Sequence, residues 1–297
     1  MAFGRAIPLR YMMRSVPTTI GKTAVQAQTS DNTSLQGRVA FISGGTSGLN
    51  LGIAKGLVRR GASVLVFGRD AAKADAAAKE ITAETGGRAI GASADVRDYA
   101  SLTETFTRAA GELGKPSIVI AGAAGNFPAP AIGISANGFK TVVDIDLLGT
   151  FNVFKASFDL LAKPASLIAI SAPQGVLPRP MQAHVCAAKA GVNMLVKCLA
   201  MEWSAGGIRV NAISPGPIQG TEGVARLAPT DADKKAWADK LAIRRLGTAE
   251  ELANVAAFLC TEQASYMTGA IVDCDGGSQF GDASADCLTP PAPRKKG

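Results

Sequence analysis

The sequence is poor in metal-binding residues and in long apolar runs. It contains one histidine, His184, and five cysteines, none of which forms a Cys-x-x-Cys pair. Structural zinc sites need several closely spaced His and Cys ligands, so we expect no metal site and reduced thiols typical of a reducing compartment. No run of about 20 apolar residues lacks glycine or proline, which predicts no membrane-spanning helix.

Acidic residues are absent before Asp31, although the same stretch carries four basic residues, Arg5, Arg10, Arg14 and Lys22. Much of the net charge of +7 therefore lies in the two tails. No basic face interleaved with aromatic residues is visible, which argues against nucleic-acid binding.

The two ends of the chain are expected to lie outside the folded domain. Residues 1–34 are rich in Arg, Ser and Thr, which fits a mitochondrial transit peptide; a disordered extension or an upstream start codon fits equally well. Residues 282–297 are Pro-rich and charged and are predicted to be disordered. The mitochondrial matrix is the expected compartment. The alternatives are the cytoplasm, or the peroxisome without a C-terminal Ser-Lys-Leu signal.

Strand and helix patterns alternate through residues 35–281, which predicts one α/β domain. Its apolar runs are bounded by glycine turns and read as strands buried on both faces. Repeated βα units with short links predict a doubly wound parallel sheet of the Rossmann type, with the ligand outside the carboxyl ends of the strands. Residues 138–161 and 182–204 show two long helical patterns, and Thr248 with Glu251 predicts a capping box.

Residues 38–50 are the most informative stretch. A buried strand, residues 39–42, is followed by the glycine turn Ser43-Gly44-Gly45 and then by apolar residues at helical spacing. This order places backbone N–H groups at a helix N-terminus, where a pyrophosphate can bind.

From about Leu35 to Gly281 the chain resembles the short-chain dehydrogenase/reductase family. The glycine motif of that family appears as residues 43–50, with Asn50 in place of the third glycine. We expect a slightly altered turn there, because Asn tolerates positive φ better than most residues. The family's Pro-Gly segment appears as residues 214–218.

The resemblance implies a set of cofactor-binding residues. The glycine turn contributes Gly44, Thr46, Ser47, Gly48 and Leu49. Asp95 and Val96 are expected to contact the adenine, and Ala121 to lie beside the adenosine ribose. Pro215 and Ile218 are expected to face the nicotinamide, and Lys189 to bind the hydroxyls of its ribose. The second strand ends at Arg69 and lacks the acid that would hold an unphosphorylated ribose. Arg69 therefore predicts NADPH as the cofactor, because its guanidinium can pair with the 2′-phosphate of NADPH. The alternative is that Arg69 is only a solvated arginine at the start of a helix.

The catalytic residues depart from the family pattern. Lys189 is retained, but the tyrosine position four residues earlier is Val185, which can neither donate nor accept a proton. The usual serine position is Ala172, beside Ser171, and the usual asparagine is Asp146. Either the site is inactive and the protein only binds NADP(H), or another group supplies the proton.

Three separated blocks resemble the peroxisomal-type 2,4-dienoyl-CoA reductases, a branch that lacks the tyrosine and has an aspartate at the position of Asp146. They are residues 122–127, 144–146 and 215–223. The resemblance implies NADPH-dependent reduction of 2,4-dienoyl-CoA to 3-enoyl-CoA in fatty-acid β-oxidation. A reductase of another conjugated or carbonyl substrate is the alternative.

In that reaction we expect Asp146 and Lys189 to orient a proton-donating water. Asn126 and Phe127 are expected to line the acyl pocket, or alternatively to serve only in loop packing. His184 is interpreted as structural or peripheral, because it points about 140° around the helix from Lys189.

Residues 219–245 are predicted to form a mobile substrate lid. Five basic residues there are candidates for the CoA phosphates, although a solvated helix face explains each of them as well: Arg226, Lys234, Lys235, Arg244 and Arg245. The resemblance further implies a homotetramer formed through the two long helices.

Overall fold

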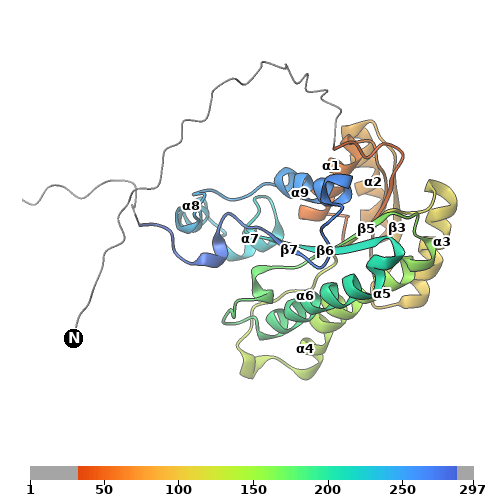
Figure 1. Ribbon diagram of the computed structural model, residues 1–297. Helices are drawn as coiled ribbons and strands as arrows, with labels where there is room; N and C mark the ends of the chain where they lie inside the picture. The colour runs from red at the N-terminus through yellow and green to blue at the C-terminus, as the bar shows by residue number, and fades with distance from the viewer. Residues whose placement is uncertain (1–32, 286–297) are drawn as a thin grey trace, which may run out of the picture. The chain divides into compact units, whose positions relative to one another are not determined.

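Seven parallel strands form the centre of the structure, a computed structural model that describes residues 33–285 (Figure 1). The strands are β1 (Val39–Ser43), β2 (Ser63–Gly68), β3 (Ala89–Ser93), β4 (Ile118–Ala121), β5 (Ala165–Ile170), β6 (Ile208–Pro215) and β7 (Ile271–Cys274). Their order in the sheet is β3-β2-β1-β4-β5-β6-β7, and every neighbouring pair is parallel. This confirms the predicted doubly wound sheet. Nearly all of the predicted N-terminal extension and most of the C-terminal tail lie outside the described residues.

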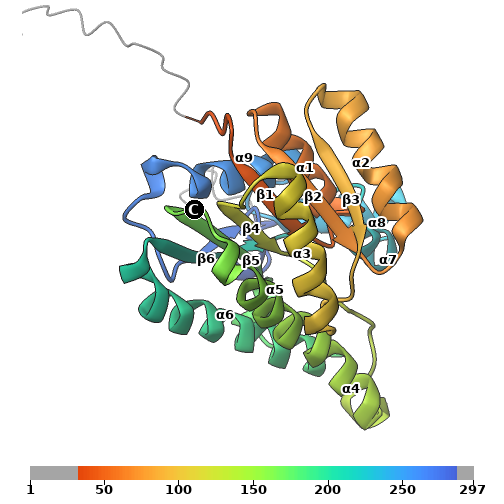
Figure 2. The same ribbon diagram turned by 90° about the vertical axis from the view of Figure 1, so that its right-hand side faces the viewer.

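Helices cover both faces of the sheet (Figure 2). They are α1 (Gly48–Arg59), α2 (Ala71–Thr85), α3 (Tyr99–Leu113), α4 (Ala136–Val143), α5 (Gly149–Ser157), α6 (Ala183–Trp203), α7 (Glu222–Leu227), α8 (Asp231–Lys240) and α9 (Ala249–Cys260). The core on one face takes residues from α1, α2 and α9, and the core on the other takes them from α3, α5 and α6. The helices α7 and α8 lie apart from both layers, at one end of the sheet (Figure 1).

Strand β1 shows why the central strands are apolar throughout. Ala40 and Ile42 pack into the core beneath α1 and α9, whereas Phe41 packs into the opposite core beside Phe106. Successive side chains of a strand point to opposite faces, and here both faces are covered. All five β1 residues are consequently buried.

Helix α1 is held close to α9 by small residues. A Cβ atom on Gly52 or Gly56 would lie 2.3 or 2.4 Å from the Cβ of Ala249 or Ala253, respectively. The two glycines are four residues apart and so share one face of α1. The capping box of α9 forms as predicted, through Thr248 and Glu251. This packing fixes the direction in which the N-terminus of α1 points.

The first of the two long helices is interrupted. The pattern over residues 138–161 predicted one regular helix, but a π-helical turn, Asp144–Leu148, separates α4 from α5. The Gly149 amide donates to the Asp144 carbonyl, five residues earlier. Turns of this kind are found mostly as single insertions in α-helices, frequently at functional sites. Helix α6 agrees with the second prediction to within one residue at each end.

Candidate active site

A pocket of about 760 Å³ lies at the carboxyl ends of the strands. Its walls include Gly122, Ser171 and Gly216, which directly follow β4, β5 and β6. Asn50, in the helix that follows β1, also lines it. The strand order reverses between β1 and β4, and ligands of open α/β sheets bind at such switch points. The pocket therefore lies where the sequence predicted the ligand.

The turn between β1 and α1 fits a phosphate group. Gly44 and Gly48 have φ of 65° and 57°, a region that glycine adopts without a steric penalty. Ser47, at the N-cap of α1, makes no side-chain capping bond, and the first turn contains no acid. The first N–H groups of an α-helix have no partner within it, so they can donate to a cofactor pyrophosphate here.

Asn50 does not have the role expected from the motif. It was predicted to take the left-handed position of a third glycine, but it lies inside α1 and is not among the positive-φ residues. Its Nδ2 donates to the Gly122 carbonyl at 2.8 Å. A Cβ on Gly122 would lie 2.4 Å from that nitrogen, so the small residue after β4 is required by Asn50. The side chain thus joins the β1–α1 turn to the segment after β4.

The adenine end of the predicted cofactor site lies outside the pocket lining. Arg69 follows β2 and is exposed. The carboxylate of Asp95 accepts hydrogen bonds from Arg97, which hold its pKa below the ordinary value. Val96 is buried, and its carbonyl accepts from Asn152. Of the predicted cofactor residues, those that line the pocket are Leu49, Lys189, Pro215 and Ile218.

Asp146 and Lys189 form a buried ion pair on the pocket wall. The Lys189 Nζ lies 3.0 Å from the Asp146 Oδ2, and the two residues are 6% and 1% exposed. Asp146 is in the π-helical turn and Lys189 is in α6. The structure therefore brings together the two residues predicted to act in catalysis.

The surroundings of the pair hold it in place and leave one buried carboxylate oxygen without a hydrogen bond. Asp146 Oδ1 accepts from the Gly125 amide at 2.7 Å, and Lys189 Nζ donates to the Ile170 carbonyl at 2.9 Å. Asp146 Oδ2 faces the ammonium group but makes no hydrogen bond within residues 33–285. A buried carboxylate oxygen needs hydrogen bonds, so Oδ2 can accept one from a ligand or a water molecule.

The position of the missing tyrosine faces the same pocket. Val185, one helical turn before Lys189, is buried and lines the pocket, as does Ala172. The Ser171 hydroxyl donates to the Asn193 Oδ1 at 2.5 Å, so its proton is already engaged. No tyrosine is found among the pocket-lining residues of the described chain.

Of the two residues predicted to line the acyl pocket, only one does so. Asn126 lines the pocket, whereas Phe127 lies outside the lining, with its ring centroid 4.4 Å from that of His184. His184 is fully buried, and neither ring nitrogen has a hydrogen-bond partner within the described chain. It does not line the pocket, in agreement with its interpretation as a structural or peripheral residue.

The structure adds residues that sequence reasoning missed. Helices α7 and α8 and the segment before residue 283 cover one side of the pocket, where Trp237, Lys240 and Asp282 line it. The loop between β5 and α6 contributes Arg179 and Gln182. The sequence could have indicated these two residues only through the position of their loop after β5, because loop residues show no periodicity.

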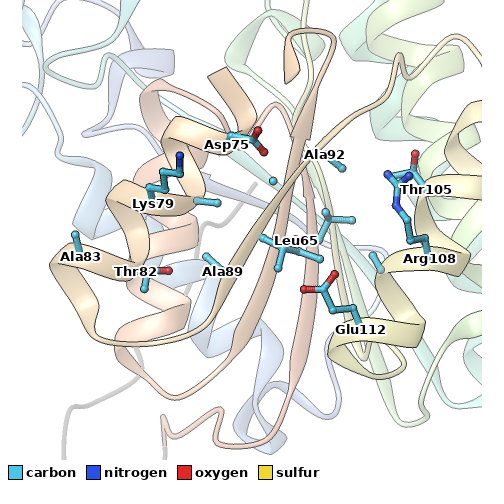
Figure 3. Close-up of a pocket in the computed structure, with 14 residues that line it drawn as sticks. Leu65, Asp75, Lys79, Thr82, Ala83, Ala89, Ala92, Thr105, Arg108 and Glu112 are labelled. Atoms are coloured by element: carbon cyan, nitrogen blue, oxygen red, sulfur yellow. The ribbon is translucent and has the colours of Figure 1, made fainter. Parts of the chain in front are cut away.

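A second hollow, of about 530 Å³, lies beside the edge strand β3 between α2 and α3 (Figure 3). Leu65 and residues 89–92 line it, together with two acids and two bases, Asp75, Lys79, Arg108 and Glu112. It lies along the flank of the sheet rather than at the carboxyl ends, and its charges balance. We therefore assign the active site to the larger pocket.

Residues 33–285 contain no group of His, Cys, Asp and Glu side chains suited to a metal ion. Among them, no helix is both long and apolar enough to cross a membrane. Burial raises the pKa of the Cys260 thiol to about 11.

Comparisons with known proteins find related reductases and dehydrogenases. A family model described as Enoyl-(Acyl carrier protein) reductase matches residues 44–279. The chain is 41% identical over 246 residues to the peroxisomal 2,4-dienoyl-CoA reductase [(3E)-enoyl-CoA-producing] of Mus musculus, covering 82% of this chain and 84% of that one. The Danio rerio enzyme of the same name is 37% identical over 252 residues, covering 84% of each chain.

Two solved structures share the fold. A short-chain type dehydrogenase/reductase from Mycobacterium marinum superposes with a TM-score of 0.76 at 30% identity, covering 83% of this chain and 97% of that one. A gluconate 5-dehydrogenase from Burkholderia cenocepacia J2315, in complex with NADP and tartrate, gives 0.77 at 28% identity, with coverage of 83% and 97%.

Proposed function

This chain belongs to the short-chain dehydrogenase/reductase family, and from that premise we propose that it reduces 2,4-dienoyl-CoA to 3-enoyl-CoA with NADPH. The observation that carries the proposal is the buried pair of Asp146 and Lys189 in a pocket whose tyrosine position is Val185. A carbonyl reductase needs an acid next to the reacting oxygen. A dienoyl thioester instead needs a proton at carbon, so the usual tyrosine is dispensable.

In the proposed reaction the cofactor supplies the hydride, and Asp146 and Lys189 direct the proton. Bound NADPH supplies a hydride to C5 of the dienoyl group, and the electrons of the two double bonds move toward the thioester oxygen. The resulting dienolate takes a proton at its α-carbon, which leaves one double bond between C3 and C4. Asp146 Oδ2, which has no hydrogen-bond partner in the described chain, orients the proton-donating water together with Lys189, whose Nζ lies 3.0 Å away.

NADPH is the proposed cofactor because Arg69 follows β2, whose own residues include no acid, and because the adjacent Asp70 is engaged as the N-cap of α2, where it accepts from the Lys73 amide. Its guanidinium, exposed and without an ion pair among residues 33–285, can bind a 2′-phosphate bidentately. The solved relative with bound NADP is consistent with this choice.

The compartment and the assembly are part of the same proposal. The named relatives are peroxisomal enzymes, which supports the peroxisome and fatty-acid β-oxidation and gives no support to the mitochondrial matrix expected from the N-terminal segment. A homotetramer through the two long helices is supported by exposed apolar side chains along α4, the π-helical turn, α5 and α6. These are Phe139, Leu148, Phe151, Met194 and Met201.

The test is NADPH oxidation by the purified protein with 2,4-hexadienoyl-CoA and identification of the product by mass spectrometry and NMR. We expect a 3-enoyl-CoA from the wild type. In Asp146→Asn, kcat is expected to fall by roughly 10²- to 10⁴-fold, the usual contribution of a positioned acid–base group. NADPH binding, followed by fluorescence, should be retained.

Asp144→Asn is the matched control. Asp144 belongs to the same π-helical turn but pairs with Lys140 on the surface, 2.5 Å away. Its loss should change kcat by less than about twofold, since exposed ion pairs contribute little. Equal loss in both variants would mean that the turn rather than the carboxylate matters. A wild type that binds NADPH but reduces no dienoyl thioester would refute the proposed function.

A further inference from the structure

One buried side chain beside the active site has no part in the proposed reaction. His184, the second residue of α6, is fully buried, and neither of its ring nitrogens makes a hydrogen bond within residues 33–285. Burying a polar group without a partner is unfavourable, so the presence of this ring needs a physical reason. Because the nitrogens are unpaired, the ring contributes to the structure through the contacts of its face.

The face of the His184 ring packs against Phe127. The two ring centroids are 4.4 Å apart, and the planes are tilted by 38°. Aromatic rings attract each other at such separations. Helix α4 also approaches the Phe127 ring, since a Cβ on Gly138 would lie 3.3 Å from the Phe127 Cζ. Phe127 is 36% exposed in the segment that follows β4, but its ring is held by contacts to both α4 and α6.

Asn126 lies between two anchored positions of this segment. On one side of it, the Gly125 amide donates to the Asp146 Oδ1 at 2.7 Å, and on the other side Phe127 packs against His184. Asn126 lines the pocket, and its side-chain amide makes no hydrogen bond within the part of the chain that the structure describes. The amide nitrogen can therefore donate to the thioester oxygen, on which negative charge develops in the proposed reaction.

We propose that His184 positions Asn126, through Phe127, for the step that forms the dienolate, an inference that rests on the proposed function. A donor on a free segment has to be ordered in every turnover. A donor that is already held in place stabilises the developing charge without that cost. His184 is therefore a positioning residue, which affects the chemical step and leaves the binding of NADPH unchanged.

Substitutions on the two sides of the ring contact give the first test. In His184→Ala and in Phe127→Ala we expect kcat with 2,4-hexadienoyl-CoA to fall by about tenfold, because the donor is misplaced, with KM for NADPH unchanged. His184→Phe keeps a ring and removes only nitrogens that have no partner in the described chain, so it should retain the wild-type kcat. A His184→Phe variant with the wild-type Tm but the kcat of His184→Ala would overturn the inference.

A double-mutant cycle separates positioning from a general effect on the fold. In an Asn126→Ala background the positioned amide is missing, so His184→Ala should lower kcat no further. His184→Ala combined with Phe127→Ala should likewise lower kcat no more than either substitution alone. A second tenfold loss from His184→Ala in the Asn126→Ala background would mean that His184 acts by another route, and would overturn the inference.

Trp203→Leu is the matched control, because it removes an aromatic contact at the other end of α6. The Trp203 and Phe158 ring centroids are 4.8 Å apart, and neither residue lines the pocket. We expect this variant to have a lower Tm and an unchanged kcat. If kcat falls as far as in His184→Ala, the stability of α6 explains both losses, and the position of Asn126 does not.

Failure of the proposed function is distinguishable from failure of this inference. If the wild type reduces no dienoyl thioester, the proposed function fails, and titration calorimetry with crotonyl-CoA then tests the positioning of Asn126 by binding alone. Weaker binding in His184→Ala, with no such effect in the Asn126→Ala background, would sustain the positioning role. Equal binding to wild type and His184→Ala, or no binding to either, would overturn it.

Discussion

The two halves of the active-site pocket are built in different ways. The nucleotide half, residues 43–50, 121–125 and 214–218, consists mostly of small residues whose backbones lie close to one another. The lid half, residues 171–182, 221–241 and 278–282, presents large and charged side chains to the pocket. In the first half the backbone forms the binding surface, so an added methyl group is harmful. In the second half larger side chains line the pocket, and the space around the backbone differs between positions: a Cβ on Gly223 would meet nothing within 4 Å, whereas one on Gly175 would lie 2.5 Å from Asn193 Nδ2.

Arg69 is the exception in the nucleotide region, because it is expected to act through its charge. In Arg69→Gln we expect KM for NADPH to rise by about 10- to 100-fold, the value of a lost charge-assisted bidentate contact, with KM for NADH unchanged. Steady-state kinetics with both cofactors measures this. Equal changes for the two cofactors would mean that Arg69 does not read the 2′-phosphate.

A pair of alanine substitutions tests the contrast directly. A Cβ on Gly216 would lie 2.5 Å from the backbone of Asp275, whereas a Cβ on Gly223, in α7, meets nothing within 4 Å. We expect Gly216→Ala to lower the free energy of unfolding by about 1 to 3 kcal/mol through overpacking. Gly223→Ala should leave it unchanged or raise it by about 0.5 kcal/mol, since alanine favours a helix.

Chemical denaturation of both variants, followed by circular dichroism, supplies the two free energies. Equal stability of Gly216→Ala and the wild type would show that the backbone of the nucleotide half can accommodate an added methyl group. The proposed contrast between the halves would then be wrong.

The smallest effect concerns the contact between the lid and α9. Hydrogen bonds from Arg245 and from the Thr248 amide lower the pKa of Glu251 from 4.5 to about 2. A carboxylate whose pKa is lower in the folded state than in the unfolded state stabilises the fold at pH values above its unfolded-state pKa. This contribution is lost as the pH falls from about 4.5 toward 2. We expect the wild-type Tm to fall more steeply over this range than that of Glu251→Gln. Because Glu251 is partly exposed, the difference should be small.

Scanning calorimetry between pH 5 and pH 2 would measure both slopes. Parallel curves for the two proteins would show that the Arg245–Glu251 contact does not stabilise the fold in solution. The tie between the lid and the scaffold would then depend on packing alone.

The fold was predictable because the apolar runs, the glycine turns and the helical patterns of the sequence all indicate the same alternation of strands and helices. Apolar runs such as residues 39–42 and glycine turns such as residues 43–45 repeat along the chain in the same order. The proximity of Asp146 and Lys189 at the pocket wall was also predictable, since the resemblance placed each on a known helix, while their catalytic role stays a prediction. Asn50 was misjudged because its motif position suggested backbone freedom, whereas its side chain makes the decisive contact.

Two features of the site needed the three-dimensional structure. The π-helical turn has no signal of its own, since its residues continue an ordinary helical pattern. The sequence predicted the cations for the CoA phosphates in residues 219–245, because that segment is rich in Lys and Arg. Only the folded chain shows that those residues pair with nearby acids, while Arg179, in a loop without periodicity, lines the pocket.

The π-helical turn makes the number of residues between α4 and α5 decide where the Asp146 side chain points. Each residue of an α-helix advances the direction of its side chain by about 100°. The extra residue in the turn at Asp144–Leu148 therefore shifts the phase between α4 and α5, and each helix presents a different set of side chains to its neighbours. A chain one residue shorter here would still contain Asp146 but would change the phase between α4 and α5, and so the direction of Asp146 toward Lys189 on α6. Residue identity alone does not describe this site; the count of residues between its helices does.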